Sequence, residues 1–135
     1  MSTTSKAASA ETMVREIASR AHAPYSGFRV GAVLEDLDGN LHAGCNVESA
    51  SIGLSLCAER AALAAAWSCG MRSFKRVWIY TPTPEPTRPC GACREMLLRC
   101  AGDMGVILLC DGESVERTRL ARLLPGAGMG TRRRP

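Results

Sequence analysis

The chain has 135 residues, 46% of them hydrophobic, which is enough for one domain with its own core and excludes a largely disordered protein. Much of its net charge of +4 comes from Arg132 to Arg134 rather than from a basic surface with interleaved aromatic residues, so we predict no nucleic-acid partner. Because the apolar runs are too short to cross a bilayer and the first ten residues lack the apolar stretch of a secretory signal, we expect a cytoplasmic protein with no membrane partner.

The first part of the chain predicts a helix and a β-hairpin. Apolar residues at helical spacing indicate a helix from about Glu11 to Ala23, which Pro24 ends. Alternating apolar residues from Phe28 to Leu34 indicate a strand. The turn signal Asp38-Gly39-Asn40 then leads into the second arm of a hairpin at 41–47.

The rest of the chain predicts helices that alternate with strands. Residues 57–69 are alanine-rich and precede Gly70, which predicts a helix with a glycine C-cap. The proline-rich segment 82–89 predicts a loop. The other expected elements are a strand, a helix, a strand and a short final helix, at 76–81, 91–100, 105–110 and 117–124. This order favours one sheet with helices on its faces, and it leaves a fifth strand open without placing it.

The expected elements form one unit without repeats or linkers. We predict a flexible N-terminus at 1–10, a single domain at 11–128 and a basic C-terminal tail at 129–135.

Seven cysteines, an odd number, favour metal ligands and buried thiols over a disulfide framework. Cys57 and Cys90 begin predicted helices, and Cys93 projects from the same side of its first helical turn as Cys90. The positive ends of two helix dipoles favour thiolates there. Because three thiolates suit zinc and leave its fourth position open for water, we predict one Zn²⁺ per chain on these residues. The other cysteines are expected to be core thiols: Cys45, Cys69, Cys100 and Cys110.

Three charged residues stand beside the predicted ligands. Glu59 lies two residues after Cys57, where its carboxylate can take a proton from the metal's water and pass it to a substrate. This spacing, followed by Pro-Cys-x-x-Cys at 89–93, is typical of zinc base deaminases. Arg60 and Arg94 each directly follow a site residue, so we predict that both hydrogen-bond the sulfurs and offset their negative charge.

Two long motifs resemble a known family. Residues 44–60 read GCNVESASIGLSLCAER and residues 89–95 read PCGACRE, and together they resemble the cytidine deaminases, small homotetrameric zinc enzymes related to blasticidin S deaminases. The resemblance extends from Pro24 to Pro125. It implies an α/β fold of three layers, a mixed five-stranded sheet sandwiched by helices, with neighbouring subunits completing each site. It also implies hydrolysis of cytidine or deoxycytidine to uridine or deoxyuridine and ammonia, in pyrimidine salvage.

The resemblance also implies the substrate contacts. Asn46 and Glu48 match positions that hydrogen-bond the ribose hydroxyls, Phe28 matches a ring that packs on the pyrimidine, and the Ala58 backbone would contact the base. An amide and a carboxylate suit sugar hydroxyls and do not suit a 5′-phosphate, which favours a nucleoside over a nucleotide.

The chain departs from the family's pattern at three positions, and the departures keep alternatives open. Ile52 and Gly128 stand where the family has aromatic residues that help to close the pocket, and Glu95 replaces a glutamine, as in some blasticidin S deaminases. One alternative is therefore a deaminase of a bulkier cytosine-nucleoside antibiotic. An alternative of another class is a structural zinc module. The structural module is disfavoured because no Cys or His at paired spacing near Cys57 offers a fourth zinc ligand. A structural site would also give Glu59 no role.

Overall fold

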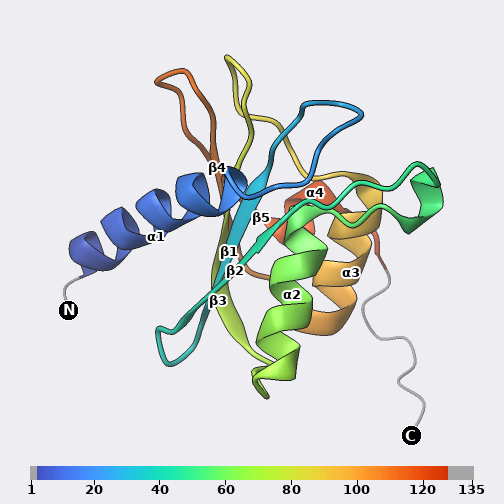
Figure 1. The fold of residues 1–135 in the computed structure, drawn as a ribbon. Helices are drawn as coiled ribbons and strands as arrows, with labels where there is room; N and C mark the ends of the chain where they lie inside the picture. The colour runs from blue at the N-terminus through green and yellow to red at the C-terminus, as the bar shows by residue number, and fades with distance from the viewer. Residues whose placement is uncertain (1–2, 128–135) are drawn as a thin grey trace, which may run out of the picture.

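The computed structural model describes residues 3–127, which form a mixed five-stranded sheet with helices on both faces (Figure 1). The strands are β1 (Gly31–Asp36), β2 (Leu41–Cys45), β3 (Phe74–Tyr80), β4 (Gly105–Leu109) and β5 (Glu116–Arg119). Their order is β2-β1-β3-β4-β5; β3 and β4 pair in parallel, and the other neighbours pair antiparallel. This confirms the predicted α/β class and the mixed sheet.

The helices divide between the two faces. Helix α1 (Thr3–Ala18) covers one face, and α2 (Ala58–Ser68) and α3 (Gly91–Ala101) lie side by side on the other, with the short α4 (Leu120–Leu123) beside them (Figure 1). A 3-10 turn, η1 (Ile52–Leu54), precedes α2. Within the part of the chain that the structure describes, no helix combines the length and apolar character needed to cross a membrane.

Successive side chains of the central strands pack alternately into two separate hydrophobic cores, one on each face of the sheet. In β3, Val77 and Ile79 join the core under α2, α3 and α4, whereas Trp78 between them joins the core under α1. A strand projects successive side chains to opposite faces, so a strand covered on both sides buries consecutive residues. All six residues of β1 are buried, and its two charged residues, Glu35 and Asp36, pair with Arg76 and His42.

Helix α2 lies very close to the sheet because the facing residues are small. Ala58, Ala62 and Ala66 are fully buried. A Cβ atom added to Gly44 in β2 would lie 2.3 Å from the backbone nitrogen of Ala62 and 2.7 Å from the backbone oxygen of Ala58. A glycine at this position therefore allows the start of α2, where Glu59 lies, to approach the end of β2.

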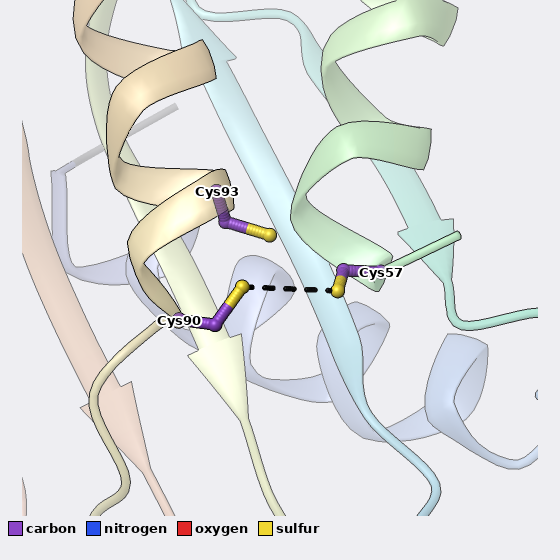
Figure 2. Close-up of side chains that lie close together, drawn as sticks. All are labelled: Cys57, Cys90 and Cys93. Atoms are coloured by element: carbon purple, nitrogen blue, oxygen red, sulfur yellow. Dashed lines mark hydrogen bonds between the residues drawn. The ribbon is translucent and has the colours of Figure 1, made fainter. Parts of the chain in front are cut away.

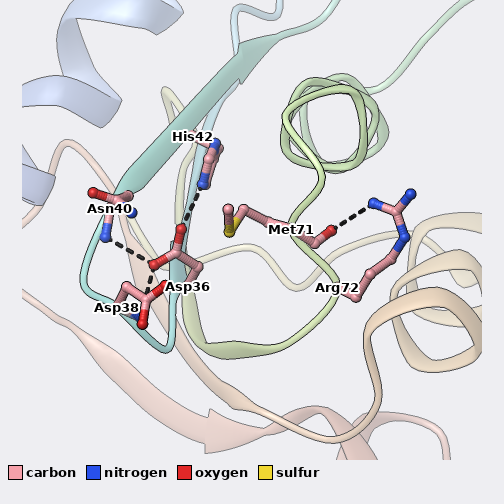
Figure 3. Close-up of polar contacts among 6 residues, drawn as sticks. All are labelled: Asp36, Asp38, Asn40, His42, Met71 and Arg72. Carbon is pink, nitrogen blue, oxygen red and sulfur yellow. Dashed lines mark hydrogen bonds and ion pairs between the residues drawn. The ribbon is translucent and has the colours of Figure 1, made fainter.

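The β1–β2 hairpin is held at the end of the sheet that lies away from the start of α2. Its turn is organised by Asp36, whose Oδ1 accepts backbone N–H bonds from Asp38 and Asn40 at 2.9 Å each and whose Oδ2 lies 2.9 Å from Nε2 of His42 (Figure 3). Burial alone would raise the pKa of Asp36, but the hydrogen bonds from His42, Asn40 and Asp38 together lower it, so the buried carboxyl stays ionised. The His42 side chain is only 11% exposed.

Helix α1 differs from its prediction at both ends. It begins at Thr3 rather than at about Glu11, and Ala10 is fully buried. It ends at Ala18 rather than Ala23 because the next backbone segment pairs with the segment after β2. There the His22 nitrogen donates to the Asn46 oxygen at 3.0 Å, and the Glu48 nitrogen donates to the His22 oxygen at 2.8 Å.

The C-terminal part also corrects the sequence analysis. The helix predicted at 117–124 is confined to α4, and its first residues belong to β5, the fifth strand that the pattern did not place. Thr118 pairs with Val106 on the free edge of β4, and this pairing outweighs the helical spacing of the leucines that follow. The predicted basic tail at 129–135 lies outside the described residues, as does Gly128.

Candidate active site

Three cysteines meet where the N-terminal ends of α2 and α3 come together. Cys57 is the N-cap of α2, Cys90 is the N-cap of α3, and Cys93 lies in the first turn of α3. Their sulfur atoms point toward one another and all lie within 4.8 Å of one another, with 4.0 Å between those of Cys57 and Cys90 (Figure 2). The structure therefore brings together all the predicted metal ligands.

The spacing of the sulfurs fits zinc. Zn–S bonds of about 2.3 Å in tetrahedral geometry place two sulfurs roughly 3.8 Å apart, close to the observed separation. Among residues 3–127, the group that could hold a metal contains these three cysteines and no fourth Cys, His or carboxylate. Three protein ligands are the number found in catalytic zinc sites, whereas structural sites have four.

The proton affinities of the sulfurs differ because they share one small site. A hydrogen bond from Cys93, followed by the hydrogen bond and positive charge of Arg60, lowers the pKa of Cys57 to about 5. The Arg60 Nη2 atom lies 3.4 Å from the Cys57 sulfur, as predicted. The hydrogen bond to Cys57 and burial raise the pKa of Cys93. The cluster thus forms one thiolate readily, that of Cys57, while Cys93 holds its proton.

Glu59 lies beside the cluster in the first turn of α2. It is only 5% exposed, and burial, together with the nearby negative charge of Cys57, raises the pKa of its carboxyl. A buried carboxyl with a raised pKa, beside a metal site, is suited to accept and return a proton.

A cavity of about 260 Å³ opens onto this cluster. Of the predicted substrate residues, Phe28, Asn46 and Ala58 line it, together with Glu59. Its other lining residues are Val30, Cys57, Ile79, Thr81, Thr87, Arg88, Pro89 and Cys90. Two of the predicted metal ligands, Cys57 and Cys90, therefore share one cavity with the carboxyl and the predicted base-binding residues.

Asn46 also organises the wall of this cavity. Its Oδ1 accepts the Val30 N–H and its Nδ2 donates to the Phe28 oxygen, both at 2.8 Å. These bonds replace strand pairing, which explains why β1 begins at Gly31 and not at Phe28 as predicted. One amide hydrogen of Asn46 stays available to a ligand.

Glu48 lies in an adjoining groove of about 470 Å³ and does not line the main cavity. Its Oε1 accepts the N–H groups of Tyr25 and Ser26 at 3.1 Å each, and its Oε2 accepts the Ser26 hydroxyl. The Ser26 hydroxyl is the main cause of the lowered pKa of Glu48, so its carboxylate is negative next to the cavity. Ile52 lines the same groove and is 85% exposed, while Asn46 lines both spaces.

The prediction that Arg94 hydrogen-bonds the sulfurs is wrong. Its Nε donates to the Pro89 oxygen and its Nη1 donates to the Leu123 oxygen, both at 2.7 Å. Arg94 therefore reaches backbone carbonyls next to the site and not its centre.

Sequence reasoning missed part of the cavity wall and misplaced one thiol. Thr81, Thr87 and Arg88 line the cavity, and Arg88 pairs with Glu116 through two nitrogens at 2.7 and 3.0 Å. For Thr87 and Arg88 the available signal was their position shortly before Cys90, because residues joined to a metal ligand must pass the site. Cys69, expected in the core, is exposed at the far end of α2.

Comparisons with known proteins agree in sequence and in structure. A sequence model described as "Cytidine and deoxycytidylate deaminase zinc-binding region" matches residues 4–110, a range that includes Cys57, Glu59, Cys90 and Cys93. The cytidine deaminase of Sporosarcina psychrophila is 44% identical over 109 residues, which cover 80% of each chain. The crystal structure of cytidine deaminase from Burkholderia pseudomallei matches with a TM-score of 0.86 and 37% identity, covering 94% of this chain and 99% of that one. The cytidine deaminase structure from Mycobacterium tuberculosis matches with a TM-score of 0.76 and 35% identity, covering 89% and 94%.

Proposed function

The chain belongs to the cytidine and deoxycytidylate deaminase family, and we propose that it is a zinc-dependent enzyme that hydrolyses cytidine and deoxycytidine to uridine and deoxyuridine. The reaction replaces the amino group on C4 of the cytosine ring by oxygen from water and releases ammonia. The observation that carries the proposal is the three-cysteine cluster with Glu59 beside it, opening into a cavity that Phe28 and Asn46 also line.

We propose that Cys57, Cys90 and Cys93 hold one zinc ion per chain. When bound, zinc lowers the pKa of water to roughly 7 and so supplies a nucleophile at neutral pH. Arg60 donates a hydrogen bond to the Cys57 sulfur and reduces the negative charge that three thiolates bring to the centre.

Glu59 carries the protons in this proposal. Its carboxylate accepts a proton from the attacking water and delivers protons to the ring nitrogen N3 and to the departing amino nitrogen. This role is supported by the burial of Glu59 and by the raised pKa of its carboxyl. A buried carboxyl with a raised pKa can keep a proton between two transfers without exchanging it with solvent.

The remaining cavity residues position the nucleoside. We propose that the Phe28 ring packs on the pyrimidine and that the free amide hydrogen of Asn46 binds a ribose hydroxyl. The Ala58 N–H belongs to the first turn of α2, where backbone donors have no helical partner, and would bind the base. The Glu48 carboxylate next to the cavity would bind ribose hydroxyls and repel a 5′-phosphate, which selects nucleosides over nucleotides.

A substrate panel tests the proposed reaction. We expect loss of cytosine absorbance with cytidine and deoxycytidine, and much slower loss with CMP, because its phosphate would approach the Glu48 carboxylate. Free cytosine should also react slowly, because it lacks the sugar that Asn46 binds. Turnover of blasticidin S without turnover of cytidine would overturn the proposed substrate and leave the zinc chemistry in place.

We propose that the enzyme is a homotetramer whose subunits cover the groove beside the cavity. Large apolar side chains are unusually exposed there: Ile52 and Leu54 on η1 are 85% and 76% exposed, and Tyr25 is 65% exposed. Clustered exposed apolar side chains are typical of protein–protein contact surfaces. Light scattering should give four times the mass of one chain, and a fully active monomer would contradict this proposal.

We also propose that the enzyme acts in the cytoplasm, in pyrimidine salvage. None of the seven cysteines, all of which lie within the described residues, forms a disulfide, which suits a reducing compartment. Uridine and deoxyuridine, the products of the proposed reaction, retain their sugar and can be reused.

A further inference from the structure

Arg94 joins two backbone segments that are far apart in the sequence. It is partly buried in the first turn of α3, directly after Cys93. Its guanidinium binds the carbonyl oxygen of Pro89, just before α3, and the carbonyl oxygen of Leu123, at the end of α4, at 2.7 Å each. Because a guanidinium is planar and presents its N–H groups in fixed directions, the two carbonyls are held in one relative position.

The Pro89 carbonyl belongs to the residue that precedes the proposed ligand Cys90. The helix itself does not bind this carbonyl, because the first backbone bond of α3 runs from the Arg94 nitrogen to the Cys90 oxygen at 3.0 Å. The segment before it, 82–89, contains four prolines and lies outside helices and strands. The Arg94 side chain therefore holds the carbonyl of the residue directly before Cys90, while Arg88, one residue further back, pairs with Glu116.

The second carbonyl that Arg94 binds, that of Leu123, belongs to a residue packed in the core. Leu123 is 5% exposed and packs in the same core as Leu97 and Leu98 of α3. The Cys57 side of the site has a separate support, because Leu56 pairs with Val47 next to β2. The two halves of the cysteine cluster thus depend on different parts of the fold.

We propose that Arg94 is a positioning residue for the metal site, which fixes the Cys90 thiolate relative to Cys57 and Cys93 through the Pro89 and Leu123 carbonyls and not through contact with sulfur. The inference rests on the zinc centre of the proposed function. It assigns Arg94 a role different from that of Arg60, which binds a sulfur directly.

The rate of zinc release tests this role without relying on activity. Zinc-loaded wild type and variants are mixed with excess of a chromogenic chelator under conditions where all are folded. Arg94→Ala should release zinc about tenfold faster or more, the lower end of the effect expected when support around metal ligands is lost. Arg94→Lys should lie in between, because an ammonium keeps the charge but loses the fixed two-carbonyl geometry.

Arg99→Ala is the matched control. Arg99 also lies on α3 and also binds a C-terminal carbonyl, that of Ala127 at 2.8 Å, as well as Glu95, but it lies in the last turn of α3, at the other end of the helix from Pro89. Its zinc release should stay within about twofold of wild type. Equal acceleration in Arg99→Ala and Arg94→Ala would show general loosening of α3 and overturn the inference.

Cobalt substitution gives a second measurement. Co²⁺ bound to thiolates has absorption bands that respond to ligand number and geometry, and we expect them to change in Arg94→Ala and not in Arg99→Ala. If Arg94→Ala does not fold, Arg94→Lys and Arg94→Gln answer the same question. Unchanged zinc release and unchanged cobalt bands in the folded Arg94 variants would overturn the inference. A wild type that binds no zinc would overturn the proposed function instead.

Discussion

Glu59→Gln is expected to lower kcat for cytidine by about 10² to 10⁴ fold, the usual contribution of a general acid–base group. Glutamine has nearly the same shape but cannot accept the proton of the attacking water or deliver it to N3. Zinc content and fold should be retained, because Glu59 is not part of the cysteine cluster and the substitution removes a buried ionisable group. The measurements are initial rates of deamination and metal analysis on the same samples.

Glu95→Gln is the control for this substitution. Glu95 lies on the exposed face of α3, paired with Arg99 at 2.6 Å, so the same chemical change there should leave turnover unaltered. If Glu59→Gln kept more than about a tenth of wild-type turnover, another group would have to carry the protons.

Cys57→Ala is expected to reduce bound zinc from one per chain to almost none and to abolish deamination. Cys57 has a lowered pKa and its sulfur accepts a hydrogen bond from Arg60, so its loss removes a thiolate that forms readily. Two remaining sulfurs would not hold zinc against a chelator, since affinity depends on the full set of deprotonated ligands. Metal analysis after brief chelator treatment measures the effect.

Cys69→Ala is the matched control, because Cys69 lies exposed at the opposite end of the same helix. It should keep zinc and activity. Stoichiometric zinc in Cys57→Ala would mean that the ligand set is not the one proposed.

The centre of the site could be predicted from the sequence because its geometry is local. Cys57 with Glu59, and Cys90 with Cys93, each occupy the first turn of a helix, where spacing alone determines which side chains lie together. The helices themselves were predictable from the alanine-rich composition of α2 and from the glycine that follows it. The sequence could not show that the two helix ends meet, but the shared ligand chemistry made that the natural interpretation.

The parts that could not be predicted depend on contacts between distant segments. Arg60 and Arg94 have equivalent places after site residues, yet one meets a sulfur and the other meets carbonyls at Pro89 and Leu123. Thr118 lies in a strand because it pairs with the edge of β4. The spacing of apolar residues around Thr118 gives no sign of this pairing. Such outcomes are decided by tertiary packing, which overrides local preference.

X-ray absorption at the zinc edge of the purified wild-type protein tests the central claim most directly, because it counts the sulfurs around the metal. A catalytic centre on Cys57, Cys90 and Cys93 predicts three sulfurs and one lighter atom, the open position that deamination requires. Four sulfurs, or protein purified without chelator that contains no zinc, would contradict the account.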